Sequence, residues 1–275
     1  MRRRIVFSMN PVVALCALFL VVPGAPVVGQ EVDACPENQL AGRMYYGEFD
    51  RMEFSCSGIA HRDLDPMEAE ITQRSYTYRL LEEHRVSFME VSGDSGGRWL
   101  VLKNDRMVFL YDGSENHHFF RAVTGSPNSM EAYYRFSDNF SASSTLTEGN
   151  IVYEAENLGS EWLAKPWVEG APGQGIGEEI RIDQWFSRLW ISIGYVSYER
   201  PELYEMNSRP SRIRVISEAT GDEAVFELED TPNPQPIEVP GEYETASEGP
   251  IRIIIEDVYP GTRWEDTCIN FIAFF

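Results

Sequence analysis

Short runs of alternating hydrophobic and polar residues dominate the chain after about residue 30. In the first half, β-branched and aromatic residues with partial alternation predict strands at 43–49, 53–56, 70–80, 85–91, 98–102 and 107–111. A helix starting at Asp65-Pro66 is an alternative for residues 65–81, but Thr72 and Tyr76 favour a strand. We therefore expect residues 30–136 to form a small β-barrel or meander whose role the sequence does not reveal.

The second half contains eight strand candidates separated by turn-forming clusters. The candidates are 166–169, 178–183, 189–195, 211–217, 224–229, 237–239, 250–258 and 267–275. Short strands at this spacing predict a two-sheet sandwich or jelly roll in residues 145–275. The run 251–255 is apolar on both parities, which indicates a central and well-buried strand.

A short polar stretch separates the two halves. Residues 137–144 are mostly serine, asparagine, aspartate and alanine, a composition typical of a linker. The pattern therefore predicts an all-β protein with two domains, 30–136 and 145–275, joined by this linker.

The first 29 residues predict export. Arg2, Arg3 and Arg4 precede an apolar run from about 12 to 22, and Val27-Val28-Gly29 offers a cleavage site. This order is typical of a signal peptide, and the run is too short to span a bilayer permanently. Lipid attachment is an alternative, because residues 32–35 loosely imitate a lipobox. We expect an exported chain, periplasmic or at the cell surface, with no membrane span.

The charge of the chain limits the classes of molecule that it can bind. Its formal net charge is −21, so phosphate backbones and anionic membranes are repelled, and nucleic acid is excluded as a partner. A hydrophobic content of 43% favours a packed globular body over disorder. Composition leaves the oligomeric state open.

The cysteines agree with export. Cys16 lies in the predicted signal peptide, and in an oxidising compartment Cys35 and Cys56 would plausibly close a short loop as a disulfide. Cys268 is left over, in an alternating run that predicts the final strand, and we expect it to be buried. No pair of cysteines has metal-ligand spacing, and the histidines form no second cluster, so we expect no metal and no cofactor.

Several short motifs in the second half carry a resemblance. They are Trp167-Val168-Glu169-Gly170, Gly175-Ile176-Gly177-Glu178, Gly194-Tyr195, Tyr204 with Asn207 and Arg209, and Val258-Tyr259-Pro260-Gly261 followed by Asp266-Thr267-Cys268-Ile269. In this order and spacing they resemble the NADase-type glycan-binding domain, a discoidin-like module distantly similar to coagulation factor type C domains. The resemblance covers about residues 140–275. It implies a galactose-binding-like jelly roll and carbohydrate recognition, without the enzymatic domain of the NAD glycohydrolase that gave the module its name.

The sequence departs from this pattern at Phe271. Discoidin-like modules often hold a structural calcium ion with an acidic residue of the last strand, and the resemblance places that residue at position 271. Calcium requires oxygen ligands, and a phenyl ring offers none. We therefore expect no structural ion.

Loop parity predicts where a ligand would bind. If each connection reverses the chain, loops 170–177, 195–210, 230–236 and 259–266 share one end of the sandwich. Loops 184–188, 218–223 and 240–249 then share the other end. The first end collects the candidate ligand-binding residues Tyr198, Tyr204, Asn207, Arg209, Tyr259, Trp264 and Asp266.

This mixture suits a carbohydrate. Aromatic faces contact the C–H surfaces of a sugar, and amide, guanidinium and carboxylate groups bind its hydroxyls. Asn207 and Arg209 have an alternative role, which is to pin the long loop that contains them. Trp264 lies between charged neighbours, and we expect it to be the exposed platform for the ligand.

The sequence thus predicts an exported, non-catalytic glycan-binding protein. One alternative is a protein-binding or adhesion module of the bacterial envelope, with the same loops gripping a polypeptide. A glycosidase with paired carboxylates is a further alternative, because the chain is acidic. No histidine, cysteine or serine nucleophile motif supports catalysis.

Overall fold

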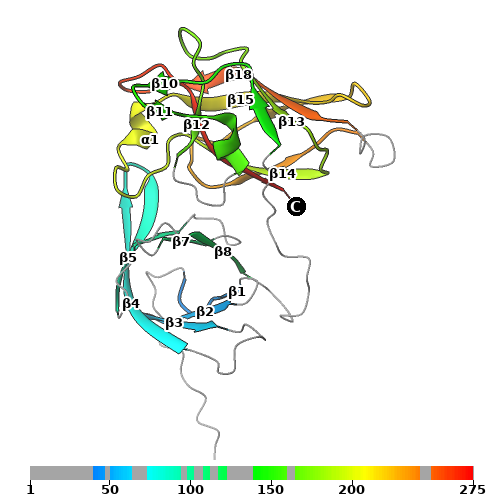
Figure 1. The fold of residues 1–275 in the computed structure, drawn as a ribbon. Helices are drawn as coiled ribbons and strands as arrows, with labels where there is room; N and C mark the ends of the chain where they lie inside the picture. The colour runs from blue at the N-terminus through cyan, green and yellow to red at the C-terminus, as the bar shows by residue number, and fades with distance from the viewer. Residues whose placement is uncertain are drawn as a thin grey trace, which may run out of the picture. The chain divides into compact units, whose positions relative to one another are not determined.

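The computed structural model describes residues 40–46, 50–63, 73–93, 98–101, 108–111, 117–122, 139–159, 165–241 and 249–274. The described residues belong to one compact unit, in which a closed barrel is followed by a β-sandwich (Figure 1). The all-β prediction is confirmed. The predicted signal peptide, residues 1–29, lies outside the described residues, as does Cys35.

Eight antiparallel strands close the barrel, because each strand pairs with the next and β8 returns to β1. They are β1 (Met44–Tyr46), β2 (Asp50–Phe54), β3 (Gly58–Asp63), β4 (Gln73–Glu83), β5 (Val86–Gly93), β6 (Arg98–Val101), β7 (Val108–Tyr111) and β8 (His117–Ala122). Met52 and Phe54 are buried and Glu53 between them is exposed, as strand alternation requires. Closure removes the free sheet edges that would otherwise invite pairing with other chains.

The sandwich consists of two sheets, and all eight strands predicted for it are present. The four-stranded sheet has the order β12 (Trp167–Val168), β19 (Cys268–Phe274), β14 (Arg188–Ile193), β17 (Gln235–Glu238). The five-stranded sheet has the order β16 (Glu223–Glu227), β15 (Arg209–Ser217), β18 (Ile251–Tyr259), β13 (Glu179–Ile182), β9 (Phe140–Ala142).

Strand β9 corrects the description of the predicted linker. Residues 140–142 lie within the stretch 137–144, yet they pair with β13 and form an edge of the sandwich. Phe140 is buried in the core, stacked on Phe274 with ring centroids 5.8 Å apart. Serine and asparagine around Phe140 conceal this strand, because its single core side chain gives no alternation to recognise.

The core of the sandwich lies between its two sheets. Isoleucines of β13, β14, β15, β18 and β19 meet there, and Trp167 is fully buried among them. The prediction that 251–255 is a central strand is confirmed, since β18 lies between β15 and β13. Its burial alternates, however: Ile251, Ile253 and Ile255 face the core, whereas Ile254 is only half-buried.

The four-stranded sheet is also covered on its outer face. Trp190 on β14 and Phe271 on β19 form a second apolar cluster with Val86 and Phe88, which belong to the hairpin of β4 and β5. This double burial explains why β14 and β19 are apolar on both parities. Phe271, at the position where the resemblance placed a calcium ligand, is packed against hydrocarbon.

Small elements complete the loop end of the sandwich. They are the hairpin of β10 (Thr147–Glu148) and β11 (Ile151–Val152), a short 3₁₀ helix (Ala155–Gly159) and helix α1 (Leu203–Met206). Within the described residues, no helix has both the length and the apolar character needed to cross a bilayer.

Candidate ligand-binding site

Four loops meet at one end of the sandwich, as loop parity predicts. The Thr267 hydroxyl donates to the Gln174 carbonyl at 2.8 Å, which joins the loop before β19 to loop 170–177. The Thr262 amide donates to the Glu205 carbonyl at 2.9 Å, and Arg209 binds Asp230. The predicted clustering of these loops is therefore confirmed.

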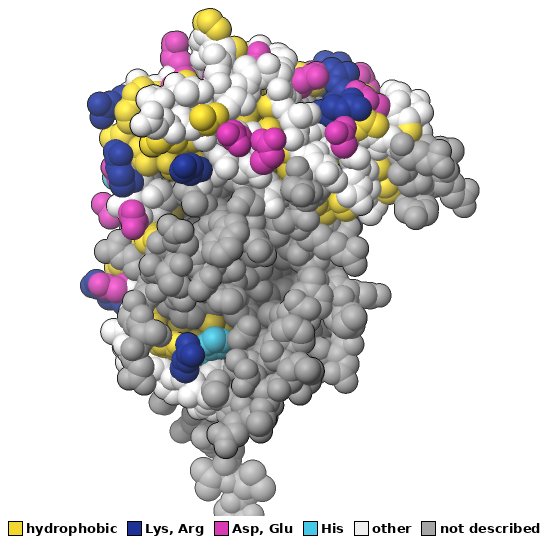
Figure 2. Space-filling model, viewed as in Figure 1, with side chains coloured by type: hydrophobic (Ala, Val, Ile, Leu, Met, Phe, Trp, Pro, Cys, Tyr) yellow, Lys and Arg dark blue, Asp and Glu magenta, His cyan; other side chains and the backbone are white. Residues whose placement is uncertain are grey.

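A pocket of about 180 Å³ opens at this end. Its lining combines aromatic, apolar and charged side chains: Leu146, Glu148, Tyr153, Val168, Tyr195, Arg200, Leu203, Asn207, Trp264 and Asp266. Figure 2 shows hydrophobic side chains gathered over β10, β11 and α1, with Lys and Arg side chains beside them. Of the candidate residues from the sequence, Asn207, Trp264 and Asp266 line this pocket.

The floor of the pocket is apolar and buried. Tyr153, Val168 and Cys268 form a small buried cluster against which Tyr195 packs, with the Tyr153 and Tyr195 ring centroids 6.2 Å apart in an edge-to-face arrangement. Burial raises the pKa of the Tyr195 phenol. Burial, followed by the charge of Glu148, raises the pKa of Tyr153. Both phenols keep their protons near neutral pH, and the Tyr153 hydroxyl donates to the Glu148 carboxylate at 3.4 Å.

Charged and amide groups occupy the rim. The carboxylates of Glu148 and Asp266 and the guanidinium of Arg200 line the opening. Arg200 Nε donates to Glu202 at 3.0 Å, so its charge is partly offset within its own loop. Asn207 is 7% exposed, and its Nδ2 donates to the Leu203 carbonyl at 2.9 Å. Its amide thus holds the end of α1, as the alternative role from the sequence proposed.

Trp264 is held by its backbone and keeps part of its ring exposed. Its amide donates to the Met206 carbonyl at 2.9 Å, and the Arg263 guanidinium lies 4.5 Å from the ring centroid. A Cβ at Gly261 would collide with the carbonyl oxygens of Trp264 and Met206, so only glycine fits this turn. The indole is half-buried, which leaves surface available for a ligand.

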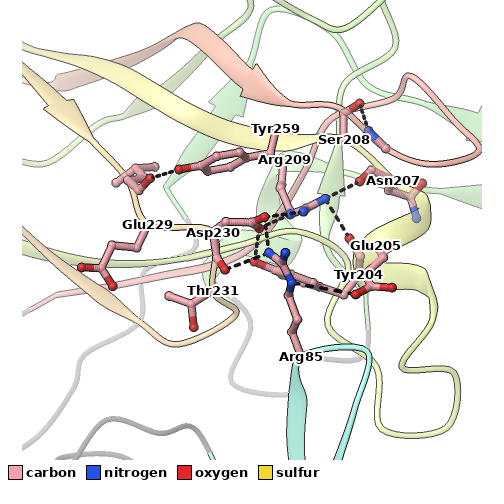
Figure 3. Close-up of polar contacts among 12 residues, drawn as sticks. Arg85, Tyr204, Glu205, Asn207, Ser208, Arg209, Glu229, Asp230, Thr231 and Tyr259 are labelled. Carbon is pink, nitrogen blue, oxygen red and sulfur yellow. Dashed lines mark hydrogen bonds and ion pairs between the residues drawn. The ribbon is translucent and has the colours of Figure 1, made fainter.

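A partly buried ion pair between Arg209 and Asp230 lies beneath these loops and holds them together (Figure 3). Arg209 binds Asp230 through two bonds, Nε to Oδ1 at 2.5 Å and Nη2 to Oδ2 at 2.8 Å. Tyr204 Oη donates to Asp230 at 3.2 Å, and Tyr259 Oη donates to the Leu228 carbonyl at 2.8 Å. The Arg209 guanidinium lies 4.7 Å and 5.7 Å from the ring centroids of Tyr204 and Tyr259.

This network separates the candidate residues by role. Tyr204 is 0% exposed and Arg209 is 5% exposed, so neither offers surface to a ligand. Tyr259 is tied to the same network, and Tyr198 packs against the cluster of Trp190 and Phe271. These four residues position the loops around the pocket without lining it.

The electrostatics of Asp230 fit a structural role. Burial opposes the ionisation of this carboxyl, but the hydrogen bonds and charges of Arg209 and Arg85 hold its pKa below the usual value. Arg85 comes from the turn between β4 and β5, and its Nη1 donates to both the carboxylate and the carbonyl of Asp230. Asp230 therefore stays charged and bridges two arginines from different parts of the fold.

Besides three aliphatic side chains, four charged or tyrosine residues of the lining were not predicted as ligand-binding groups. Glu148 and Tyr153 belong to the β10–β11 region, whose two-residue strands are too short to give a pattern. Arg200 lies in the long loop, among several charged residues of similar character. Tyr195 begins loop 195–210, which was placed at the correct end of the sandwich, but it was not among the candidate ligand-binding residues. The sequence signal for Tyr195 is its place at the end of an apolar strand, where a loop begins.

Two cysteines can be placed. Cys56 is disulfide-bonded, while Cys268 is free and fully buried. The partner of Cys56 lies outside the described residues, so its pairing with Cys35 stays a prediction. Across the described ranges, no group of three or more His, Cys, Asp or Glu side chains is arranged to hold a metal ion.

A two-sheet antiparallel sandwich with its pocket among the loops at one end defines a discoidin-like module. In a comparison with protein families, residues 133–275 match the NAD glycohydrolase translocation F5/8 type C domain. The match spans more than half of the chain, and the chain belongs to this family. The predicted resemblance is thereby confirmed.

One of the solved structures that are similar to this chain has low sequence identity. It is CpGH89CBM32-4, produced by Clostridium perfringens, in complex with GlcNAc-α-1,4-galactose. The identity is 13% and the TM-score 0.33, with coverage of 54% of this chain and 99% of the other. Among curated proteins, none matches this chain.

Proposed function

We propose that the chain is an exported, non-catalytic protein that binds a glycan in the pocket at the loop end of its sandwich. The observation that carries the proposal is the lining of that pocket. Trp264, Tyr153 and Tyr195 supply aromatic surface, and Glu148, Asp266 and Arg200 supply polar groups around it. This combination of ring faces and hydrogen-bonding groups is what a sugar requires.

The pocket is also organised before any ligand arrives. The bond from Asn207 to Leu203 fixes α1, and the Arg209–Asp230 pair fixes the loop behind it. A ligand therefore pays little for ordering the protein, which favours affinity from a small contact area. At about 180 Å³ the pocket is smaller than a typical drug site of roughly 300–1,000 Å³, so we expect it to hold one sugar unit at a time.

Support for export comes from the signal peptide that residues 1–29 predict. The disulfide at Cys56 agrees with it, because disulfides persist mainly in oxidising compartments such as the periplasm and the extracellular space. The family of the module and the binding character of the pocket favour recognition over hydrolysis.

The test is a glycan array followed by calorimetric titration of the sugars that bind. Trp264→Ala should weaken binding by about 1–3 kcal/mol and leave the melting temperature nearly unchanged, because the indole contributes ring surface at the rim. Trp264→Phe, which keeps an aromatic face, should retain most of the affinity. Equal affinity of Trp264→Ala and the natural chain would remove the pocket from consideration.

A second outcome would favour the adhesion alternative. If no glycan binds while the natural chain, but not Trp264→Ala, captures an envelope polypeptide, the same loops recognise protein. Glycan binding that is lost on Trp264→Ala excludes this reading.

A further inference from the structure

The charges of the pocket favour one kind of sugar over others. Two lining residues, Glu148 and Asp266, bring carboxylates, and one, Arg200, brings a cation. The Arg200 cation already has a partner in Glu202, and the Arg263 guanidinium is stacked on Trp264. Neither carboxylate has a cationic partner among the described residues. The pocket therefore has unneutralised negative charge.

The field of these carboxylates reaches the pocket floor. Cys268 lies in the floor cluster with Tyr153 and Val168 and is fully buried. Burial raises the pKa of its thiol, and the carboxylates of Asp266, Glu169 and Glu148 raise it further. Burial is the largest cause, and the smaller contribution of the carboxylates shows that their negative potential extends to the residues beneath the pocket.

The aromatic side chains add a second attraction for a cation. Tyr153, Tyr195 and Trp264 present three rings to one small cavity. The face of an aromatic ring attracts a cation within about 6 Å of its centre, and the attraction grows when the cation is partly desolvated. Rings and carboxylates together are the surroundings that an organic ammonium group prefers.

We propose that the preferred glycan carries a free, protonated amino group, which binds between the rings of Tyr153, Tyr195 and Trp264 and the carboxylates of Glu148 and Asp266. The ligand class is a hexosamine that is not N-acetylated. This inference rests on the proposed glycan function and specifies its ligand. Acetylation would remove the charge and enlarge the group, and a hydroxyl would satisfy the hydrogen bonds but not the charge.

The experiment uses β-1,4-linked oligosaccharides of equal length that differ only at the second carbon of each sugar. Chitosan, chitin and cello-oligosaccharides carry an ammonium, an acetamide and a hydroxyl group there. Titration into the full chain at about pH 6, where a primary amine is protonated, should give a Kd for the chitosan series about tenfold lower than for the other two. Raising the salt from about 0.05 to 0.5 M should reduce this preference, because the carboxylates lie at the rim.

Two variants locate the effect. Asp266→Asn keeps the shape of the side chain and should lower the ratio of the chitin Kd to the chitosan Kd. Asp222→Asn is the matched control, since it removes the same charge from an exposed turn at the far end of the nine-residue strand β15. That control should leave the ratio unchanged. Glu148→Gln repeats the test from the β10–β11 hairpin, and a thermal melt of each variant confirms folding.

The outcomes separate the two proposals. If the acetylated or hydroxyl series binds as tightly as the amino series, the amine preference is wrong and the glycan function stands. If none of the three oligosaccharide series binds, and the monosaccharides galactosamine, N-acetylgalactosamine and galactose do not bind either, both proposals fail. If choline binds as tightly as the chitosan series, the site recognises an ammonium group without the sugar, and the assignment to a hexosamine is wrong.

Discussion

The Arg209–Asp230 pair illustrates what one charged residue does inside this fold. The two side chains are 7% and 22% exposed, and each finds several partners. A buried ion pair adds little net stability, because desolvation offsets the attraction between its members. Removing one member is different, because the other is left buried and charged. The pair therefore fixes the arrangement of the loops beneath the pocket.

Asp230→Asn should consequently be strongly destabilising. We expect a loss of about 3–5 kcal/mol in the free energy of unfolding, since Arg209 stays buried without its counter-charge, whereas Arg85 is half-exposed and keeps Glu205 as a partner. Urea denaturation at neutral pH measures it. Asp183→Asn is the control, because Asp183 pairs with Arg181 at the surface, and it should cost less than about 1 kcal/mol. Equal costs for the two variants would show that Asp230 is not a structural bridge.

Sequence reasoning recognised the chemistry of this region better than its geometry. It placed Tyr204, Arg209 and Tyr259 at the correct end of the sandwich, where they do meet. It did not foresee Asp230 as their partner, because a lone aspartate beside Thr231 and Pro232 predicts only a turn. Residue types suited to sugars are also suited to pinning loops, and only burial distinguishes the two roles.

Among the elements, the hairpin of β4 and β5 has an unusual turn. His84 and Arg85 both have positive φ, at 49° and 66°, a conformation that residues with side chains seldom adopt. Two-residue hairpin turns of this kind usually contain asparagine or glycine. Here both side chains reach acidic partners, since His84 Nδ1 lies 3.0 Å from Glu205 and Arg85 binds Asp230. These contacts offset the cost of the turn.

His84 should make stability depend on pH. The hydrogen bond to Glu205 raises its pKa above the ordinary value of 6.5. Because the pKa of His84 is higher in the folded state, its protonation stabilises the fold. This stabilisation is fully present below about pH 6.5 and is lost as the pH rises through the pKa of His84 in the folded state. Denaturation curves between about pH 5.5 and 8.5 should show this decline. His84→Asn tolerates the turn but does not titrate, so its curve should be flatter over this window.

Element boundaries followed the sequence pattern where strands bury one face. Eight of the nine sandwich strands and six of the eight barrel strands were predicted, most of them on that basis, and β4 over residues 73–83 excludes the helical alternative there. Strands β3 and β8 of the barrel were missed, as was β9 of the sandwich. Strand β3 reads Gly58-Ile59-Ala60-His61-Arg62-Asp63, which has low β propensity and one core residue, Ile59. It is a strand because β2 and β4 pair with it on both sides.

For the whole molecule, the double burial of the four-stranded sheet links the barrel to the sandwich. Sequence patterns predicted both the barrel and the sandwich. They did not predict that the β4–β5 hairpin covers Trp190 and Phe271. An apolar strand face looks the same in a sequence whether it meets a second sheet or a distant hairpin. The predicted division into domains 30–136 and 145–275 stays a prediction.

A fragment of residues 133–275 should therefore fold poorly without the barrel. It would expose Trp190, Phe271 and Ala273, an apolar patch that promotes association. We expect the fragment to bind a hydrophobic dye and to unfold at lower urea concentration than the same module in the full chain. A soluble fragment with an unchanged midpoint would show instead that the sandwich is independent.

Helix α1 has only four residues, yet it serves two neighbours at once. Leu203 lines the pocket, and Glu205 is bound to His84 of the barrel hairpin. If contact with the hairpin holds this helix in the position that a ligand needs, the contact increases the affinity for the ligand. By linkage, the bound ligand then stabilises the contact between helix and hairpin by the same free energy. A sugar bound in the proposed pocket would therefore be coupled to the barrel hairpin through a single helical turn.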